Sequence, residues 1–216
     1  MQKVIIFAIS LLFFACNGQQ KAREGDVRQI PLEAPPGKAI AAFAEGCFWC
    51  SEHIFEAVVG VDSAVSGYAG GHTPDPTYEL VNTETTGHAE TVLVYYDPAK
   101  VNYDELTRVF FTSHDPTTPD LQGPDVGSSY RSILFFITPE EKRIAEQSLQ
   151  SFSKSGMFSA PIVTEIKKLE AFYRAEEYHQ DYIEHNPNTP YVINVSIPRY
   201  EKFRQIYKGN LKTNSD

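Results

Sequence analysis

The segment that most constrains this chain is Glu45-Gly46-Cys47-Phe48-Trp49-Cys50, which carries two of the three cysteines and the single tryptophan. The apolar run 39–44 before it predicts a strand, and residues 51–59, closed by Gly60, predict a helix. A cysteine at a helix N-terminus faces unpaired backbone N–H groups and the positive end of the helix dipole, and both stabilise a thiolate. We therefore expect Cys47 to have a lowered pKa and to be nucleophilic.

The second cysteine of the segment suits a redox role. Cys47 and Cys50 are three residues apart, so on a helix they share one face at roughly 5–6 Å, within reach of a disulfide. Three alternatives remain. Phe48 and Trp49 could be core residues beside inert cysteines, the pair could form a structural disulfide, or both thiols and His53 could bind zinc. So short a disulfide loop adds little stability, and no fourth zinc ligand is indicated. We expect no metal.

Size and charge limit the class of protein. The chain has 216 residues, 42% of them hydrophobic and 22% charged, which predicts one globular domain. Its net charge is −9 and it has no basic block. Because nucleic-acid binding needs a positively charged surface, we expect no nucleic-acid partner.

The first 37 residues predict export and anchoring rather than folding. Residues 1–15 predict a signal peptide of the lipoprotein type, because a short apolar stretch ends in a small residue directly before Cys16. We expect a lipid on Cys16 that anchors the protein to a membrane of the cell envelope or periplasm; an ordinary signal peptide cut nearby is the alternative. Residues 16–37 are polar and without periodicity, which predicts a flexible tether, and residues 38–216 form the expected folded domain.

Strand and helix patterns alternate along the domain. Strands are expected at 61–69, 89–96, 130–137 and 162–169, and helices at 103–113, 139–153, 171–185 and 198–207. The chain has no Rossmann glycine fingerprint, P-loop or internal repeat. The pattern predicts an α/β (α+β) two-layer sandwich with a mixed or mainly antiparallel sheet. Long loops at 70–86 and 114–128 could gather beside the first helix.

Five further residues are candidates for the site. Glu90 enters an apolar strand, where burial would raise its pKa and let it donate a proton; an exposed strand-end carboxylate is the alternative. Asp125 and Tyr130 belong to a glycine-framed loop and can form hydrogen bonds, and Tyr78 lies in a stiff, proline-rich loop. His179 falls in a predicted helix, where a surface position is the default.

A series of short segments occurs in order between residues 38 and 207: Gly46-Cys47-Phe48-Trp49, Pro76-Thr77-Tyr78, Thr86-Gly87-His88-Ala89-Glu90, Tyr96-Asp97-Pro98, His114-Asp115-Pro116-Thr117, Asp125-Val126-Gly127, Tyr130-Arg131-Ser132 and Tyr178-His179-Gln180. Together they resemble the A-type peptide methionine sulfoxide reductases. The resemblance implies that residues 38–216 form a reductase domain with that family's sandwich, of the ferredoxin-like plait type. It also implies reduction of methionine (S)-sulfoxide, free or in oxidised proteins, by a monomer without a cofactor that is recycled by an external thioredoxin-like dithiol.

The resemblance implies the following roles for the residues, and their chemistry is compatible with them. Cys47 attacks the sulfoxide sulfur and becomes a sulfenic acid, while Glu90 protonates the oxygen. The remaining candidates bind the substrate: Phe48, Trp49, Tyr78, Asp125, Tyr130 and His179. Phe48 and Trp49 enclose the methyl group, and the two tyrosines bind the oxygen.

The number and positions of the cysteines differ from those usual in the family. Cys50 stands where many members have glycine, no cysteine follows it, and Asn82 occupies the region of another usual cysteine. With Cys16 set aside, Cys50 is the one thiol left to resolve the sulfenic acid, and we expect it to do so. In the alternative, the donor reduces the sulfenic acid directly.

Two other functions compete with this interpretation. A thioredoxin-type thiol–disulfide oxidoreductase also has Cys-x-x-Cys at a helix start, although Phe48 and Trp49 would obstruct a protein disulfide. A catalytically inactive surface lipoprotein that binds oxidised peptides is the other.

Overall fold

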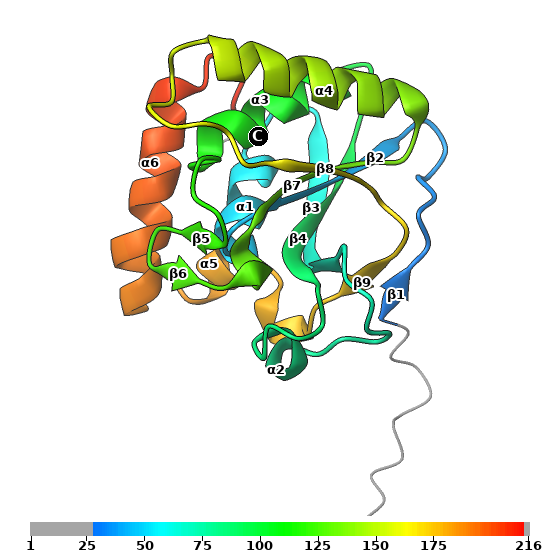
Figure 1. Ribbon diagram of the computed structural model, residues 1–216, viewed down its shortest axis with the longest axis vertical. Helices are drawn as coiled ribbons and strands as arrows, with labels where there is room; N and C mark the ends of the chain where they lie inside the picture. The colour runs from blue at the N-terminus through cyan, green and yellow to red at the C-terminus, as the bar shows by residue number, and fades with distance from the viewer. Residues whose placement is uncertain (1–27, 214–216) are drawn as a thin grey trace, which may run out of the picture.

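The computed structural model describes residues 28–213, which contain one large sheet and a small hairpin (Figure 1). The strands of these residues are β1 (Gln29–Ile30), β2 (Ala39–Glu45), β3 (Val61–Ala69), β4 (Ala89–Tyr96), β5 (Leu121–Gln122), β6 (Asp125–Val126), β7 (Ser132–Phe136), β8 (Glu165–Lys168) and β9 (Phe172–Arg174). The helices are α1 (Phe48–Glu56), α2 (Tyr78–Val81), α3 (Tyr103–Ser113), α4 (Pro139–Lys154), α5 (Tyr182–His185) and α6 (Ile197–Ile206), with the short turns η1 (Ser128–Tyr130), η2 (Glu177–His179) and η3 (Val192–Ser196).

The large sheet has the order β1-β9-β3-β4-β2-β7-β8, and all its pairs are antiparallel except β7 with β8. Its centre is built from β2-α1-β3-β4-α3-β7 with the spatial order β3-β4-β2-β7. This is the arrangement of a ferredoxin-like plait. The expected mainly antiparallel α/β sandwich is therefore confirmed.

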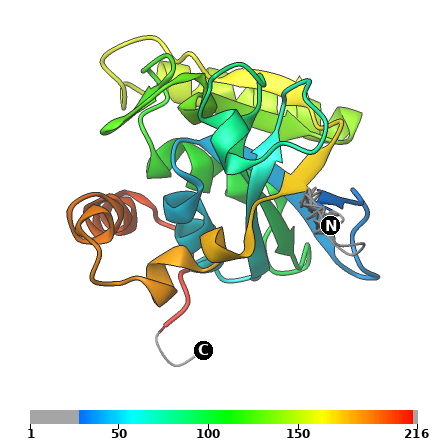
Figure 2. The same cartoon turned by 90° about the horizontal axis from the view of Figure 1, so that it is seen from below.

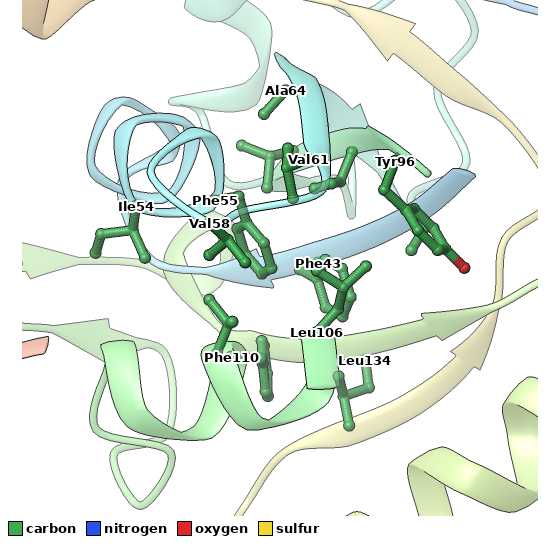
Figure 3. Close-up of a cluster of buried hydrophobic side chains, with 14 of the residues drawn as sticks. Phe43, Ile54, Phe55, Val58, Val61, Ala64, Tyr96, Leu106, Phe110 and Leu134 are labelled. Atoms are coloured by element: carbon green, nitrogen blue, oxygen red, sulfur yellow. The ribbon is translucent and has the colours of Figure 1, made fainter. Parts of the chain in front are cut away.

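Aromatic packing holds the helices against β2. Phe43 is fully buried, and its ring stacks on Phe55 of α1 with 4.6 Å between centroids. On the other side it meets Phe110 of α3 at 5.9 Å, so Phe43 lies between the two helices (Figure 3). Because side chains alternate along a strand, Ala42 and Ala44 face the opposite side of the sheet. The packing fixes α1 against β2, and so fixes the turn between them.

The opposite face of the sheet is covered by part of the predicted tether. Ile30, Leu32 and Ala34 pack against the apolar cluster on that face, and β1 pairs with β9. Arg28 forms an ion pair with Glu176 at 3.0 Å. The folded domain therefore includes Arg28 and does not begin at residue 38. The residues Pro35, Pro36 and Gly37 are typical of a linker in the sequence, whereas in the structure they form the turn into β2. The predicted signal peptide and Cys16 lie outside the described residues.

The predicted helix at 171–185 is wrong. The segment forms β9, the turn η2 and the short helix α5. Its backbone pairs with β3 through Phe172–Arg174, and the Gln180 side chain adds two bonds to the same strand, accepting from Ser66 N and donating to Ser66 O, both at 3.1 Å. Asp181 then has a φ of 50°, which breaks the chain direction before α5.

Smaller differences also matter for the site. The predicted loops contain α2 and the hairpin β5–β6, and Tyr130 ends the turn η1 rather than opening a strand. The turn η3 leads directly into α6, which lies along one side of the molecule (Figures 1 and 2). Within residues 28–213, no helix has the length and hydropathy needed to cross a membrane.

Candidate active site

A tight turn carries the chain from β2 into α1. Gly46 has a φ of +90°, and a Cβ atom placed there would lie 2.5 Å from Cγ of Gln122. Both the backbone angle and the space therefore require glycine. Cys47 follows at the N-cap position, and the helix begins at Phe48, three residues earlier than predicted.

The turn borders a cavity of about 320 Å³. Its lining residues come from α1, α2, β4, β6, η1, α5 and the segment before η3: Cys47, Phe48, Trp49, Tyr78, Glu90, Asp125, Tyr130, Tyr182 and Tyr191. Of the predicted site residues, the structure thus brings seven together, and it places Cys50 and His179 behind the lining. A larger hollow of about 590 Å³, between α3 and the C-terminal segment, contains no thiol.

Glu90 is buried at the N-terminus of α1. Its Oε2 accepts a hydrogen bond from Phe48 N at 2.9 Å, and the residue is only 3% exposed. It lies in β4 opposite Tyr68 of β3, inside the sheet rather than at its edge. Burial raises the pKa of Glu90 to about 8. The alternative of an exposed carboxylate is therefore wrong, and this side chain carries a proton at neutral pH.

The charge on the two thiols differs from the prediction. Both are free and buried, and burial together with Cys50 raises the pKa of Cys47 well above its ordinary value. The N–H of Phe48, which was expected to stabilise a Cys47 thiolate, is bonded to Glu90 instead. The hydrogen bond from Cys47 and the charge of Arg199 lower the pKa of Cys50 to about 6. Burial therefore disfavours a thiolate on Cys47, and the hydrogen bond from Cys47 and the charge of Arg199 favour one on Cys50.

Trp49 forms an aromatic wall of the cavity, and neighbouring side chains fix its position. Trp49 stacks on Tyr182 with 3.7 Å between centroids and meets Tyr191 edge-on at 5.6 Å. Its Nε1 donates to Nδ1 of His179 at 3.0 Å. Burial lowers the pKa of His179 to about 4, so the ring is neutral and accepts this bond. His179 is buried rather than at the surface, and it orients Trp49 instead of lining the cavity.

Two lining tyrosines were missed by sequence reasoning. Tyr191 donates its hydroxyl hydrogen bond to Oδ2 of Asp125 at 2.6 Å and also interacts with the Cys47 thiol. Tyr182 supports Trp49. In the sequence, Tyr182 lies within the helix predicted at 171–185 and Tyr191 lies outside all the candidate segments, so neither carried a local signal for the site.

The described residues offer no support for the zinc alternative. No group of three or more histidine, cysteine, aspartate or glutamate residues within 28–213 is arranged to hold a metal ion. His53 packs edge-on against Tyr200 at 4.6 Å.

Comparisons with known proteins agree with this geometry. The family model described as peptide methionine sulfoxide reductase matches residues 39–211. The chain belongs to the peptide methionine sulfoxide reductase family. It is 49% identical over 169 residues to the peptide methionine sulfoxide reductase MsrA of Natronomonas pharaonis, covering 78% of this chain and 95% of that protein. It is 47% identical over 173 residues to MsrA of Nautilia profundicola, covering 80% and 98%.

Solved structures give the same result. Reduced Mxr1 from Saccharomyces cerevisiae is similar with a TM-score of 0.68 and 33% identity, covering 73% of this chain and 91% of that one. Methionine sulfoxide reductase A of Corynebacterium diphtheriae has a TM-score of 0.64 and 35% identity, covering 72% and 78%. The chain is thus a thiol-dependent oxidoreductase that reduces peptide methionine sulfoxide. The comparisons give no support to the thioredoxin-type alternative.

Proposed function

We propose that this reductase acts on the S epimer of methionine sulfoxide, with Cys47 as nucleophile and Glu90 as proton donor. The observation that carries the proposal is that one small aromatic cavity contains both a thiol and a buried carboxyl that is protonated at neutral pH. A sulfoxide needs both groups, because attack on its sulfur leaves negative charge on its oxygen.

The cavity matches the shape of a methyl sulfoxide. Phe48 and Trp49 present aromatic surface to the methyl group, with their ring centroids 6.3 Å apart. Burial raises the pKa values of Tyr78 and Tyr130, so both phenols keep their protons and can donate to the sulfoxide oxygen. Asp125 acts through Tyr191, which it holds by a hydrogen bond.

The protons of the first step come from groups already in place. Cys47 attacks the sulfoxide sulfur as its proton passes to Cys50, and Glu90 transfers its proton to the oxygen. The attack forms a bond between the Cys47 sulfur and the substrate sulfur. This bond and the substrate sulfur–oxygen bond then break as the hydroxyl passes to Cys47, so methionine leaves and Cys47 becomes a sulfenic acid. Methionine sulfur is reduced by two electrons and Cys47 sulfur is oxidised by two.

In the second step Cys50 resolves the sulfenic acid. A sulfur–sulfur bond forms between Cys47 and Cys50, the Cys47–oxygen bond breaks, and hydroxide leaves with the Cys50 proton as water. Glu90 remains ionised until solvent returns its proton. An external thioredoxin-like dithiol then reduces the disulfide, with no metal or organic cofactor in the cycle. The yeast relative Mxr1 supports this donor, since it has been solved in complex with Trx2 (TM-score 0.50, 26% identity, covering 69% of this chain and 88% of that one).

The proposed stereochemistry can be tested with separated epimers. Purified protein and a small chemical dithiol should reduce peptide methionine (S)-sulfoxide and leave the R epimer unchanged, as followed by chromatography of the products. The same samples should show no faster insulin reduction than the dithiol alone. Activity confined to the R epimer would contradict the assignment, and insulin reduction without sulfoxide reduction would favour the oxidoreductase alternative.

We further propose that the protein is exported and anchored in the cell envelope through a lipid on Cys16. The support is the short apolar stretch directly before that cysteine. Cells that produce the full chain should retain the protein in the membrane fraction, and Cys16→Ser should release it. Equal partition of the two forms into the soluble fraction would refute the anchor.

A further inference from the structure

Cys50 faces away from the substrate cavity, toward a second cavity of about 560 Å³. Cys50 and Arg199 both line this second cavity, and Cys47 does not. Asp125 and Tyr191 border both cavities, and the hydrogen bond between them, at 2.6 Å, lies at the partition. The two sulfur atoms of the pair therefore have different surroundings.

One helical segment presents two polar groups toward Cys50. Ser196 ends η3 and Arg199 lies in α6, and the backbone is continuously helical between them. Residues three apart on a helix lie on the same face. The sulfur of Cys50 donates a hydrogen bond to Oγ of Ser196 at 3.3 Å, and this hydroxyl can reverse the bond when Cys50 is ionised.

The guanidinium of Arg199 is held rigidly at the base of the turn. Its Nη2 donates to Oε1 of Glu45 at 2.7 Å and to the Glu45 carbonyl at 3.0 Å, and its Nε donates to the Ser113 carbonyl at 2.8 Å. The arginine side chain is only 12% exposed, and it lines the cavity that Cys50 also lines.

We propose that Arg199 is a positioning residue that holds the negative charge of the active-site thiol pair on Cys50. The inference rests on the proposed role of Cys50 as the resolving thiol. Burial should make a thiolate costly at this position, and a fixed cation in a site of low dielectric offsets that cost. The lowered pKa of Cys50, to which the charge of Arg199 contributes, agrees with the geometry.

The position of the negative charge affects both the attack on the substrate and the reduction of the disulfide by the donor. An ionised Cys50 takes up the proton of Cys47 as Cys47 attacks the substrate. When a donor thiolate attacks the Cys47 sulfur of the disulfide, the donor–Cys47 bond forms, the Cys47–Cys50 bond breaks and Cys50 leaves as a thiolate. Leaving groups of lower pKa depart faster, so Arg199 favours release on the Cys50 side. The donor's second thiol then frees Cys47 and completes the two-electron reduction.

Several other ionisable groups influence the ionisation of the Cys50 sulfur, and their effects must be distinguished from that of Arg199. They come from every element around the pair: Cys47, Glu45, Glu90, Asp125 and Tyr191. His114, Asp115 and Lys202 line the same cavity. Glu45 is the most informative of these groups, because its carboxyl group accepts a hydrogen bond from the Arg199 guanidinium. Burial raises the pKa of Glu45 to about 7. A purely structural ion pair would be broken equally by removing either partner.

The test measures the ionisation of Cys50 without turnover. In full-length Cys47→Ser protein, the rate of iodoacetamide alkylation at Cys50 is followed over a pH series by peptide mass spectrometry, with added N-acetylcysteine as the reference thiol. Adding Arg199→Met should move the midpoint of the pH profile up by about one unit, which lowers the rate about tenfold at pH values below the midpoint. Arg199→Lys should restore most of the rate. Glu45→Gln should leave the rate unchanged or raise it.

Matched controls separate charge from folding. Arg204→Met removes an exposed arginine of α6 that pairs with Glu201 and should leave the profile unchanged. If Arg199→Met does not fold, Glu45→Gln/Arg199→Met leaves no buried charge unpaired and should still show a midpoint about one pH unit higher than that of Glu45→Gln. An unchanged profile in Arg199→Met, or equal losses in Arg199→Met and Glu45→Gln, would overturn the proposal. A failure of Cys50 to form a disulfide in the wild type would refute its resolving role without altering this result.

Discussion

Replacing Cys47 by serine should reduce turnover of methionine sulfoxide by about 10⁴-fold or more, because removal of a nucleophile eliminates the covalent step. Binding should persist, since the aromatic walls at Phe48 and Trp49 remain. The measurement is methionine formation per enzyme, alongside the affinity for a sulfoxide peptide. A wild-type protein that binds this peptide without turnover would favour the binding-protein alternative.

Replacing Cys50 by serine should have a different effect. One equivalent of methionine should still form, because Cys47 and Glu90 remain, but Cys47 should stay as a sulfenic acid and recycling should slow. In the wild type, one turnover without reductant followed by peptide mapping should find the Cys47–Cys50 disulfide. Cys16→Ser is the matched control and should change neither result. A persistent sulfenic acid on Cys47 with Cys50 free in the wild type would exclude the resolving role and favour direct reduction by the donor.

Replacing Glu90 by glutamine should slow the first turnover by roughly 10²–10⁴-fold, the usual contribution of a general acid. The amide oxygen can still accept from Phe48 N, so the helix start is preserved while the acidic proton is lost. The rate of methionine formation in single-turnover mixing is the measurement.

The pH dependence of the rate tests whether Glu90 acts as an acid. The raised pKa of about 8 means that the carboxyl is protonated below that pH and ionised above it. The wild-type rate should therefore fall about tenfold per unit above pH 8, and Glu90→Gln should lose this alkaline limb. Glu52 is a suitable control because it is also buried with a pKa near 8, but it binds Ser66 and Asp181 away from the cavity. A full alkaline limb in Glu90→Gln, or a wild-type rate that rises above pH 8, would exclude the acid role.

Much of the fold could be predicted from the sequence because the signals are local. Strand alternation, the capped start of α4 at Thr138 and the glycine turn at Gly46 depend on near neighbours. The helix predicted at 171–185 failed because the backbone of Phe172–Arg174 pairs with β3, a strand more than one hundred residues away in the chain. The edge strand β1 was missed for a similar reason, since two residues become a strand only when β9 is beside them.

The sequence by itself determined the chemistry of the turn, namely two thiols and two aromatic side chains at a helix start, together with the family. Only the tertiary structure shows that the surroundings of Cys50 favour a negative charge and those of Cys47 disfavour it. The helix start alone favoured a thiolate on Cys47. In the structure, however, the N–H of Phe48 donates its hydrogen bond to Glu90 of β4, and Arg199 of α6 lines the same cavity as Cys50. The pKa of a buried group is set by the charges and donors around it, and here these come from segments distant in the chain.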